Sequence, residues 1–316
     1  MDTTLPLSNA STNEDRRSKN SPYYLKAVGD NLTSPMRDLL ENYSGIPSDD
    51  VERHVYDLRD RAWNVHPYPC IGIFSFLELS TSEYPVYGKV LELLKSKPDT
   101  PEDQALFFDI ACCFGQDIRK LVHDGAPASA VYGTDIKPEF LELGFELFKD
   151  KSKFPEPERQ FFVADIFDAA DPDKPGIWNE LMSKFTVIQI ANFLHLFNYE
   201  RQLQICCTVA QLLVAKPGAL VIGRQLGSTN PREVELGLSG NRGSGARFWH
   251  SLETFRQMWA EVGEKTGTKW DVDVHFIELD EKKQEIVRQL RENAAAAGAE
   301  RKQPQVNYFV FTVTRV

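Results

Sequence analysis

Three aspartates end or nearly end short apolar runs in the middle of the chain: Asp109 in ALFFDIA, Asp135 in AVYGTDI and Asp165 in FFVADIF. A carboxylate at the end of a buried strand can accept hydrogen bonds from ribose hydroxyls or from the amino group of a base. We assign Asp135 to the ribose and Asp165 to the adenine amino group. The spacing therefore predicts a nucleoside-binding crevice.

The first run continues as FFDIACCFGQDIRKLV, which predicts a strand, a tight turn at Gly115 and a helix that begins near Gln116 or Asp117. Glycine at such a turn lets the backbone approach a ligand closely. A dinucleotide needs G-x-G-x-x-G around its pyrophosphate, whereas this turn reads Ala111-Cys112-Cys113-Phe114-Gly115. Asp135 alone would suit NAD, but one glycine does not form a pyrophosphate cradle.

Polar groups also end the next two apolar runs. Asn192 and His195 follow in FTVIQIANFLHLF, and Arg224 and Gln225 lie near the end of ALVIGRQL. Two interpretations of His195 stay open, a residue that contacts substrate or a histidine packed under the helix that begins near Tyr199. For Arg224 the alternatives are a substrate contact and a surface salt bridge.

From residue 105 onward, short apolar runs alternate with longer amphipathic ones. This pattern is typical of the doubly wound α/β class, and it predicts a mostly parallel seven-stranded sheet with helices on both faces. The Lys216-Pro217-Gly218 turn precedes the strand ALVIG, and residues 281–302 are expected to form a charged surface helix.

The N-terminal third has a different pattern of polar and apolar residues. Residues 1–21 are polar and are expected to form a disordered tail. Residues 22–104 space their apolar side chains as helices do and are expected to form a cap or substrate lid. We therefore divide the chain into the tail, this cap and a cofactor-binding core over residues 105–316.

The composition limits the kinds of molecule that the protein is expected to bind. The chain has 316 residues and a net charge of -10, which disfavours nucleic acid and anionic membrane surfaces. Its five cysteines show no C-x-x-C spacing, so we expect neither zinc nor a disulfide framework. No apolar run reaches the length of a membrane span, and we expect a cytoplasmic protein that works on a small molecule. The helical N-terminal unit and residues 281–302 offer surfaces for a homodimer.

The motif sequence strand-Asp-x-x-x-x-x-Gly, strand-Asp-Ile, strand-Ala-Asp-Ile-Phe and Lys-Pro-Gly-Ala-Leu resembles class I S-adenosylmethionine-dependent methyltransferases. The resemblance implies S-adenosyl-L-methionine as cofactor and a Rossmann-like core. It also implies cofactor contacts at Asp109, Ala111, Cys112, Gly115, Asp135, Ile136, Asp165, Ile166 and Asn192. The usual Gly-Cys-Gly turn is replaced by Ala111-Cys112-Cys113, so contacts to the methionine end are expected to be rearranged.

A closer resemblance lies in RDRAWNVHPYPCIGIFSFLEL, CCFGQDIRKL and RFWHSLETFRQMW. These phrases are similar to the fungal methyltransferases of meroterpenoid pathways such as those of austinol, terretonin and andrastin. The resemblance implies methyl-ester formation on a hydrophobic acid of the farnesylated dimethylorsellinic acid type. It extends over almost the whole chain after the tail.

Methyl transfer from a sulfonium is an in-line displacement that demands alignment and exclusion of water. A carboxylate, with a pKa of about 4, is ionised at neutral pH, whereas a phenol near about 10 needs a base. We take His195, Arg247 and His250 as orienting candidates, with His195 or His250 as the base if the acceptor is a phenol.

The glycine-containing stretch SGNRGSGARFWH is expected to be a movable lid. The predicted acceptor pocket consists of Trp63, Tyr68, Phe74, Arg224 and Trp249, although such aromatic residues are often plain core. A third possibility is a regulatory protein that binds the cofactor without turnover, which the altered Ala-Cys-Cys turn would favour.

Overall fold

The structure is a computed structural model, and it describes residues 17–21, 23–97, 100, 103–171, 173–174, 176–235, 246–278, 284, 288 and 307–316. Seven strands form one sheet in the order β3-β2-β1-β4-β5-β9-β8. The strands are β1 (Phe107–Ile110), β2 (Val131–Asp135), β3 (Phe161–Val163), β4 (Val187–Gln189), β5 (Leu220–Gly227), β8 (Trp270–Ile277) and β9 (Asn307–Arg315). The predicted doubly wound, mostly parallel sheet is confirmed.

The first five strands pair in parallel, and β9 runs antiparallel to both β5 and β8. Asp109 pairs in register with Gly133 and Gln189, and Asp135 pairs with Val163. Because β1, β2 and β3 are parallel, their carboxyl ends meet at one edge of the sheet, and the three aspartates are brought to that edge.

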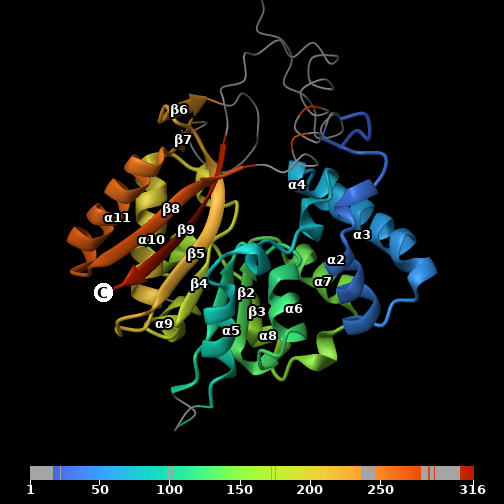
Figure 1. Ribbon diagram of the computed structural model, residues 1–316, viewed down its shortest axis with the longest axis horizontal. Helices are drawn as coiled ribbons and strands as arrows, with labels where there is room; N and C mark the ends of the chain where they lie inside the picture. Colours follow the sequence, from blue (N-terminus) through green and yellow to red (C-terminus); the bar gives the residue numbers. More distant parts are fainter. Residues whose placement is uncertain are drawn as a thin grey trace, which may run out of the picture.

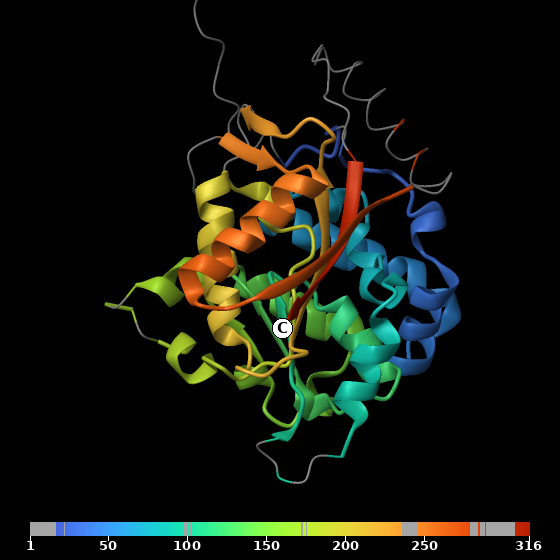
Figure 2. The same ribbon diagram turned by 60° about the vertical axis from the view of Figure 1, so that its left-hand side comes forward.

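Helices cover both faces of the sheet (Figures 1 and 2). Buried apolar side chains of α5 (Tyr87–Lys95) and α6 (Gln116–His123), with one face of α7 (Pro138–Phe148), share one core cluster with Phe107 and Ile222. Those of α9 (Trp178–Leu181), α10 (Tyr199–Leu212) and α11 (Leu252–Thr266) share a second cluster on the other face with Phe108 and Val221. Neighbouring residues of one strand thus enter opposite cores, as a sheet buried on both faces requires.

The N-terminal unit, residues 23–97, is helical as expected. It contains α2 (Ser34–Asp38), the π-helical turn η2 (Leu39–Tyr43), α3 (Val51–Val65) and α4 (Pro69–Gly72), which lie beside α7 on the right of Figure 1. Apolar residues of these helices share a third core cluster with Phe114 and Phe140, so the unit packs against the turn after β1. Between α4 and α5, the short turns η4 (Ser75–Leu77) and η5 (Ser80–Glu83) lead back to the core.

The remaining elements are short. A separate hairpin pairs β6 (Arg232–Glu235) with β7 (Ala246–Trp249), at the top of Figure 1. Further turns are η1 (Gly29–Asn31), η3 (Ser48–Asp50), η7 (Ala128–Ala130), η8 (Lys151–Lys153), α8 (Pro157–Gln160), η9 (Ile166–Ala170) and η10 (Leu194–Leu196).

Three expectations fall wholly or largely outside the described residues. Residues 236–245 include most of the predicted glycine-containing lid, residues 1–16 most of the predicted tail, and residues 281–302 are described only at 284 and 288. Within the described part of the chain, no helix has the length and apolarity needed to cross a bilayer.

Candidate active site

The turn after β1 adopts an unusual backbone. Ala111, Cys113 and Gly115 all have positive φ, at 59°, 54° and 65°. The left-handed region costs a non-glycine residue about 1–2 kcal/mol. Two hydrogen bonds fix the turn, from the Cys112 N–H to Thr134 O (2.9 Å) and from the Gly115 N–H to Cys112 O (2.8 Å). Retained strain of this kind points to a functional site.

Glycine is also required at position 115 because there is no room for a side chain. A Cβ at this position would lie 2.5 Å from Nη1 of Arg119, which donates to Phe114 O at 3.2 Å. Arg119 is 1% exposed and pairs through Nε with Asp150 (2.9 Å), which also accepts from the Tyr43 hydroxyl (2.8 Å). A buried ion pair is tolerated when further hydrogen bonds satisfy its members. This cluster carries no sequence motif, although it braces the predicted turn.

Asp135, at the end of β2, lies directly beside the turn. Its carboxylate accepts the N–H groups of Cys113 (3.0 Å) and Lys137 (2.9 Å). Burial raises the pKa of Asp135, and these backbone donors partly oppose that shift. A carboxylate offers about four acceptor positions, so two bonds leave capacity for the hydroxyls of a ligand.

Asp109 lies deeper, in a buried polar network. Burial, followed by the negative charge of Asp117, raises the pKa of Asp109 well above its usual value. Asp117 in turn accepts from the Thr81 N–H (3.0 Å), the Ser80 hydroxyl (3.3 Å) and Nε2 of Gln189 (3.2 Å). Thr81 and Ser80 belong to η5, so this network joins the N-terminal unit to the floor of the crevice.

Apolar side chains stand exposed at the ends of the second and third strands. Ile136 is 41% and Val163 50% exposed, which is unusual for large aliphatic residues beside buried acids. Asp165 caps η9 by accepting the Phe167 N–H (3.1 Å), and Ile166 is buried. This corner presents an apolar surface next to a half-buried carboxylate.

The ends of β4 and β5 carry polar atoms that lack partners among the described residues. Asn192 has a φ of 53° and donates its N–H to Arg224 O (2.7 Å), while its buried Oδ1 accepts nothing. Gln225 is 1% exposed, and neither atom of its side-chain amide is bonded. Arg224 forms an ion pair with Glu78, yet its buried Nε has no acceptor. Unsatisfied buried groups in a native fold require an explanation, such as a ligand.

The predicted imidazoles lie near this rim but are weak bases. His195 is buried, accepts a long hydrogen bond from the Leu226 N–H (3.5 Å) and has a pKa of about 3 because of burial and the nearby charge of Arg247. His250 is fully buried, its Nδ1 lies 3.1 Å from the Thr254 hydroxyl, and burial lowers its pKa to about 4. Both rings are therefore neutral at physiological pH.

The predicted pocket residues are dispersed. Trp63 and Phe74 are 1% and 0% exposed in the core of the N-terminal unit, the alternative that aromatic residues had left open. Tyr68 lies near Asp135, whose charge together with burial raises the pKa of Tyr68 to about 12. Trp249 is buried in β7, and its Nε1 has no partner among the described residues. Arg224 alone of the five joins a cluster of polar groups at the rim.

Cys112 differs from its neighbours in the turn. Its thiol lies in the core under α6, where it would be 2.9 Å from a Cβ on Gly133. Its N–H and C=O are both used within the protein. Cys112 therefore shapes the turn, and its backbone has no bonding group left over.

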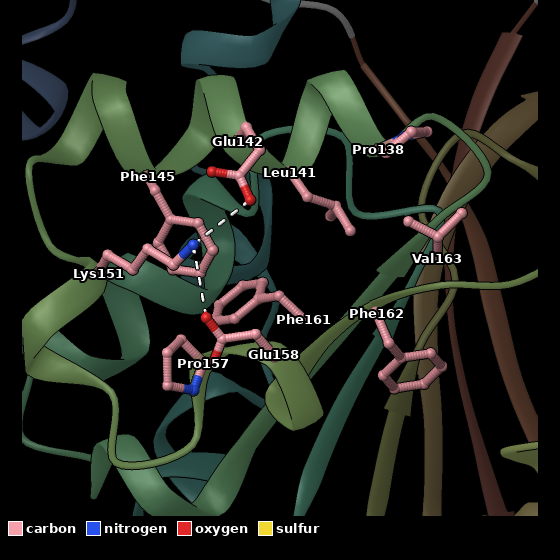
Figure 3. A pocket seen from close by; sticks show the side chains of 10 residues that line it. All are labelled: Pro138, Leu141, Glu142, Phe145, Lys151, Pro157, Glu158, Phe161, Phe162 and Val163. Atoms are coloured by element: carbon pink, nitrogen blue, oxygen red, sulfur yellow. Dashed lines mark hydrogen bonds and ion pairs between the residues drawn. The ribbon is translucent and has the colours of Figure 1, made fainter.

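A surface hollow of about 220 Å³ lies elsewhere, between α7, α8 and the edge strand β3 (Figure 3). Lys151 lies 3.5 Å from both Glu142 and Glu158 at its margin. Its lining also includes Phe145, Phe161 and, at the side toward the predicted adenine corner, the exposed Val163. The hollow is on the outer side of the sheet edge, and its charged groups are already paired.

The described elements define a class of protein. A seven-stranded sheet of this order, with one antiparallel strand between β5 and the edge strand β8, is the fold of class I S-adenosylmethionine-dependent methyltransferases. The residues present fit that cofactor: a buried acid beside a strained turn, an exposed apolar corner and unpaired polar atoms all line one edge of the sheet.

Comparison with known proteins agrees. Residues 23–77 match the family model described as meroterpenoid methyltransferase N-terminal domain. The chain is 40% identical to the O-methyltransferase atr3 of Stereocaulon alpinum, over 83% of this chain and 70% of that protein. It is 39% identical to the methyltransferase adrK of Penicillium roqueforti, over 77% of this chain and 81% of that protein. A solved structure of the plantazolicin methyltransferase BamL is 15% identical, with a TM-score of 0.45 over 89% of this chain and 95% of that one. The chain belongs to the family of fungal meroterpenoid O-methyltransferases.

Proposed function

We propose that this O-methyltransferase forms a methyl ester on a hydrophobic, prenylated aromatic carboxylic acid. The observation that carries the proposal is the state of the two rim histidines. With pKa values of about 3 and about 4, His195 and His250 are poor proton acceptors at neutral pH. A carboxylate acceptor needs no base because it is already ionised.

In this proposal the turn 111–115, together with Asn192, borders the methionine end of the cofactor. Asp135 accepts hydrogen bonds from the ribose hydroxyls through the lone pairs that its two backbone donors leave unused. Ile136 and Val163 contact the adenine ring, with Asp165 and Ile166 at its amino edge. Asp109 supports the crevice floor through its buried network. When bound, S-adenosylmethionine supplies an electrophilic sulfonium methyl group.

The chain's own part in the reaction is orientation and exclusion of water. The N-terminal unit lies within the predicted cap of residues 22–104. It covers the turn by packing against Phe114 of the turn and Phe140 of α7. At the acceptor side, Arg247 and the neutral His195 and His250 orient the substrate, with Trp249 behind them. The left-handed turn supports cofactor binding, since Ala111 and Cys113 hold the backbone shape at an energetic cost, and the O-methyltransferase relatives support turnover.

Two further points belong to the proposal. Cysteines 70, 112, 113, 206 and 207 are all free, which suits the reducing cytoplasm. The N-terminal helices and the charged segment 281–302 offer surfaces for a homodimer.

Product analysis tests the ester. The enzyme is incubated with methyl-labelled cofactor and farnesylated dimethylorsellinic acid, and the product is treated with mild alkali. An ester releases the label as methanol, whereas an aryl ether keeps it. Label that withstands alkali would contradict the proposal and favour the phenol alternative.

A further inference from the structure

The N-terminal unit and the core meet at a partly buried ion pair on the acceptor side. Glu78 follows η4, and its Oε2 pairs with Nη2 of Arg224 in β5. The two side chains are 24% and 8% exposed. Glu78 was not among the residues expected from the sequence, because a single glutamate after an aromatic stretch carries no motif.

The surroundings of Arg224 are polar and incompletely satisfied. The Tyr308 ring centroid lies 5.9 Å from the guanidinium carbon. The buried hydroxyl of Tyr84 has no hydrogen-bond partner in the described part of the chain, and neither has Nε of Arg224. Burial lowers the pKa of Arg224, but the charge of Glu78, its hydrogen bond and the nearby Tyr84 and Tyr308 together raise the pKa above its usual value, so the group is cationic at every working pH.

A guanidinium has five N–H donors in a rigid fork, and a buried donor without an acceptor is costly. Glu78 accepts a hydrogen bond from Nη2 of Arg224 and thereby fixes the plane of the guanidinium group. The Nε–H group of Arg224 is left without an acceptor among the described residues. The ligand that suits this donor best is another carboxylate, because charge-assisted hydrogen bonds to a planar anion are about twice as strong as neutral ones. A phenol or amide would satisfy it less well.

A second link between the same two parts shows what a purely structural ion pair looks like here. Arg61 of α3 donates to both oxygens of Glu146 in α7, at 2.5 and 2.7 Å. These side chains are 45% and 49% exposed. This pair is solvated and bidentate, whereas the Glu78–Arg224 pair is partly buried and leaves Nε of Arg224 without an acceptor among the described residues.

We propose that Arg224 anchors the carboxylate of the acceptor through its Nε side, and that Glu78 is a positioning residue that holds the guanidinium for it. The inference rests on the proposed function in that the acceptor is an acid. It adds a residue of the N-terminal unit to substrate selection, so that this unit helps to distinguish acids from neutral analogues.

Equilibrium binding tests the anchor without requiring turnover. Binding of farnesylated dimethylorsellinic acid and of its primary amide is measured with S-adenosylhomocysteine present. Wild type should prefer the acid by at least about 30-fold, and R224Q should lose about 10- to 100-fold in acid affinity with little change for the amide. If R224Q does not fold, R224M serves, since it keeps most of the apolar stem but has no N–H donor and no charge. Unchanged preference in a folded Arg224 variant overturns the proposal.

Glu78 is tested by a pair of variants. E78Q retains an oxygen acceptor for Nη2 and removes a competing charge, so its KM for the acid should equal or fall below that of wild type. E78A loses the acceptor, and its KM should rise about 10-fold while kcat stays within about threefold. The control E146A should leave both constants unchanged. Equal behaviour of E78A and E78Q would contradict the positioning role.

The outcomes separate this inference from the proposed function. An aryl ether product, combined with loss of acid preference in R224Q, would refute ester formation and leave the anchor standing. An ester product with full acid preference in R224Q would refute the anchor and leave ester formation standing.

Discussion

In the half of the crevice formed by β1 and β2, acidic groups are tied to backbone donors: Asp135 accepts from Cys113 and Lys137, and Asp117 accepts from Thr81. In the half formed by β4 and β5, Gln225 and Nε of Arg224 keep buried polar atoms without partners among the described residues, while Asn192 lies at the border with the cofactor half. The first half ties its acids to backbone donors and keeps capacity for a ligand on Asp135 and on Oε1 of Gln116, whereas the capacity of the second half lies on buried amide and guanidinium groups. A cofactor shared by many enzymes suits the first, and a particular acceptor suits the second.

The largest effect is expected from G115A, which attacks the rigid half. The new Cβ would meet Arg119 at 2.5 Å in a left-handed backbone, so we expect a loss of at least about 3 kcal/mol in stability and over about 100-fold in S-adenosylhomocysteine affinity. Thermal unfolding and titration calorimetry measure the two quantities. G218A is the matched control, since Gly218 also has positive φ (89°) but nothing within 4 Å of its Cβ position. Equal loss in both variants would refute a specific role for the turn.

Q225L tests the unsatisfied half. Replacing a buried, unbonded amide by an apolar side chain should leave stability unchanged or raise it by about 1–2 kcal/mol, while kcat/KM falls at least about 10-fold. Gln202 is the control, because its Nε2 donates to Phe197 O (2.9 Å) and Phe248 O (2.8 Å). Q202L should destabilise the protein by about 1–3 kcal/mol. Denaturant unfolding measures the stability of both variants. A Q225L variant that is destabilised but fully active would show that the amide is structural.

The pH dependence tests the rim histidines. In the folded protein the pKa of His195 is about 3, against 6.5 for an ordinary histidine, so below about pH 6.5 the unfolded chain binds more protons. Wild type should therefore lose stability as the pH falls from 6.5 toward 3, and H195N should lose less. Between about pH 6 and 9, kcat/KM for an acid should show no histidine ionisation. An ascending limb near neutral pH that H195N abolishes would favour the phenol alternative.

The smallest effect is expected from A111G. Relief of a positive φ gains about 1–2 kcal/mol, and the added chain entropy of glycine costs about 0.5–1 kcal/mol. The net change should be a stabilisation of about 1 kcal/mol or less with unchanged cofactor affinity. Chemical denaturation and calorimetry measure both, and a marked loss of affinity would mean that the Ala111 methyl group itself contacts the ligand.

The contrast between the two halves also explains what the sequence revealed. Asp135 and Gly115 were recognised because each follows an apolar strand, and strand ends are placed by hydrophobic patterning alone. The sheet and both helical layers follow from the same pattern. The strained φ values at Ala111 and Cys113 could not be read in this way, since neither residue type favours them.

The acceptor side was less predictable because it depends on contacts between distant segments. Glu78 and Arg224 are brought together only when the N-terminal unit folds over β5. Trp63 and Phe74 resembled pocket residues but fill the core of that unit, a distinction that aromatic composition cannot make. His195 and His250 were predicted at the rim from the segments that follow strands four and five, whereas their low basicity arises from tertiary burial, which the sequence does not show.

Titration of S-adenosylhomocysteine into D135N and R224Q tests the division of the crevice most directly. Asp135 should contribute charge-assisted bonds to the ribose, so D135N should weaken binding by about 10- to 100-fold, whereas R224Q should stay within about twofold of wild type. D168N, which alters an exposed acid paired with Lys174, is the control and should have no effect. If R224Q loses the cofactor and D135N keeps it, the assignment of the two halves is wrong.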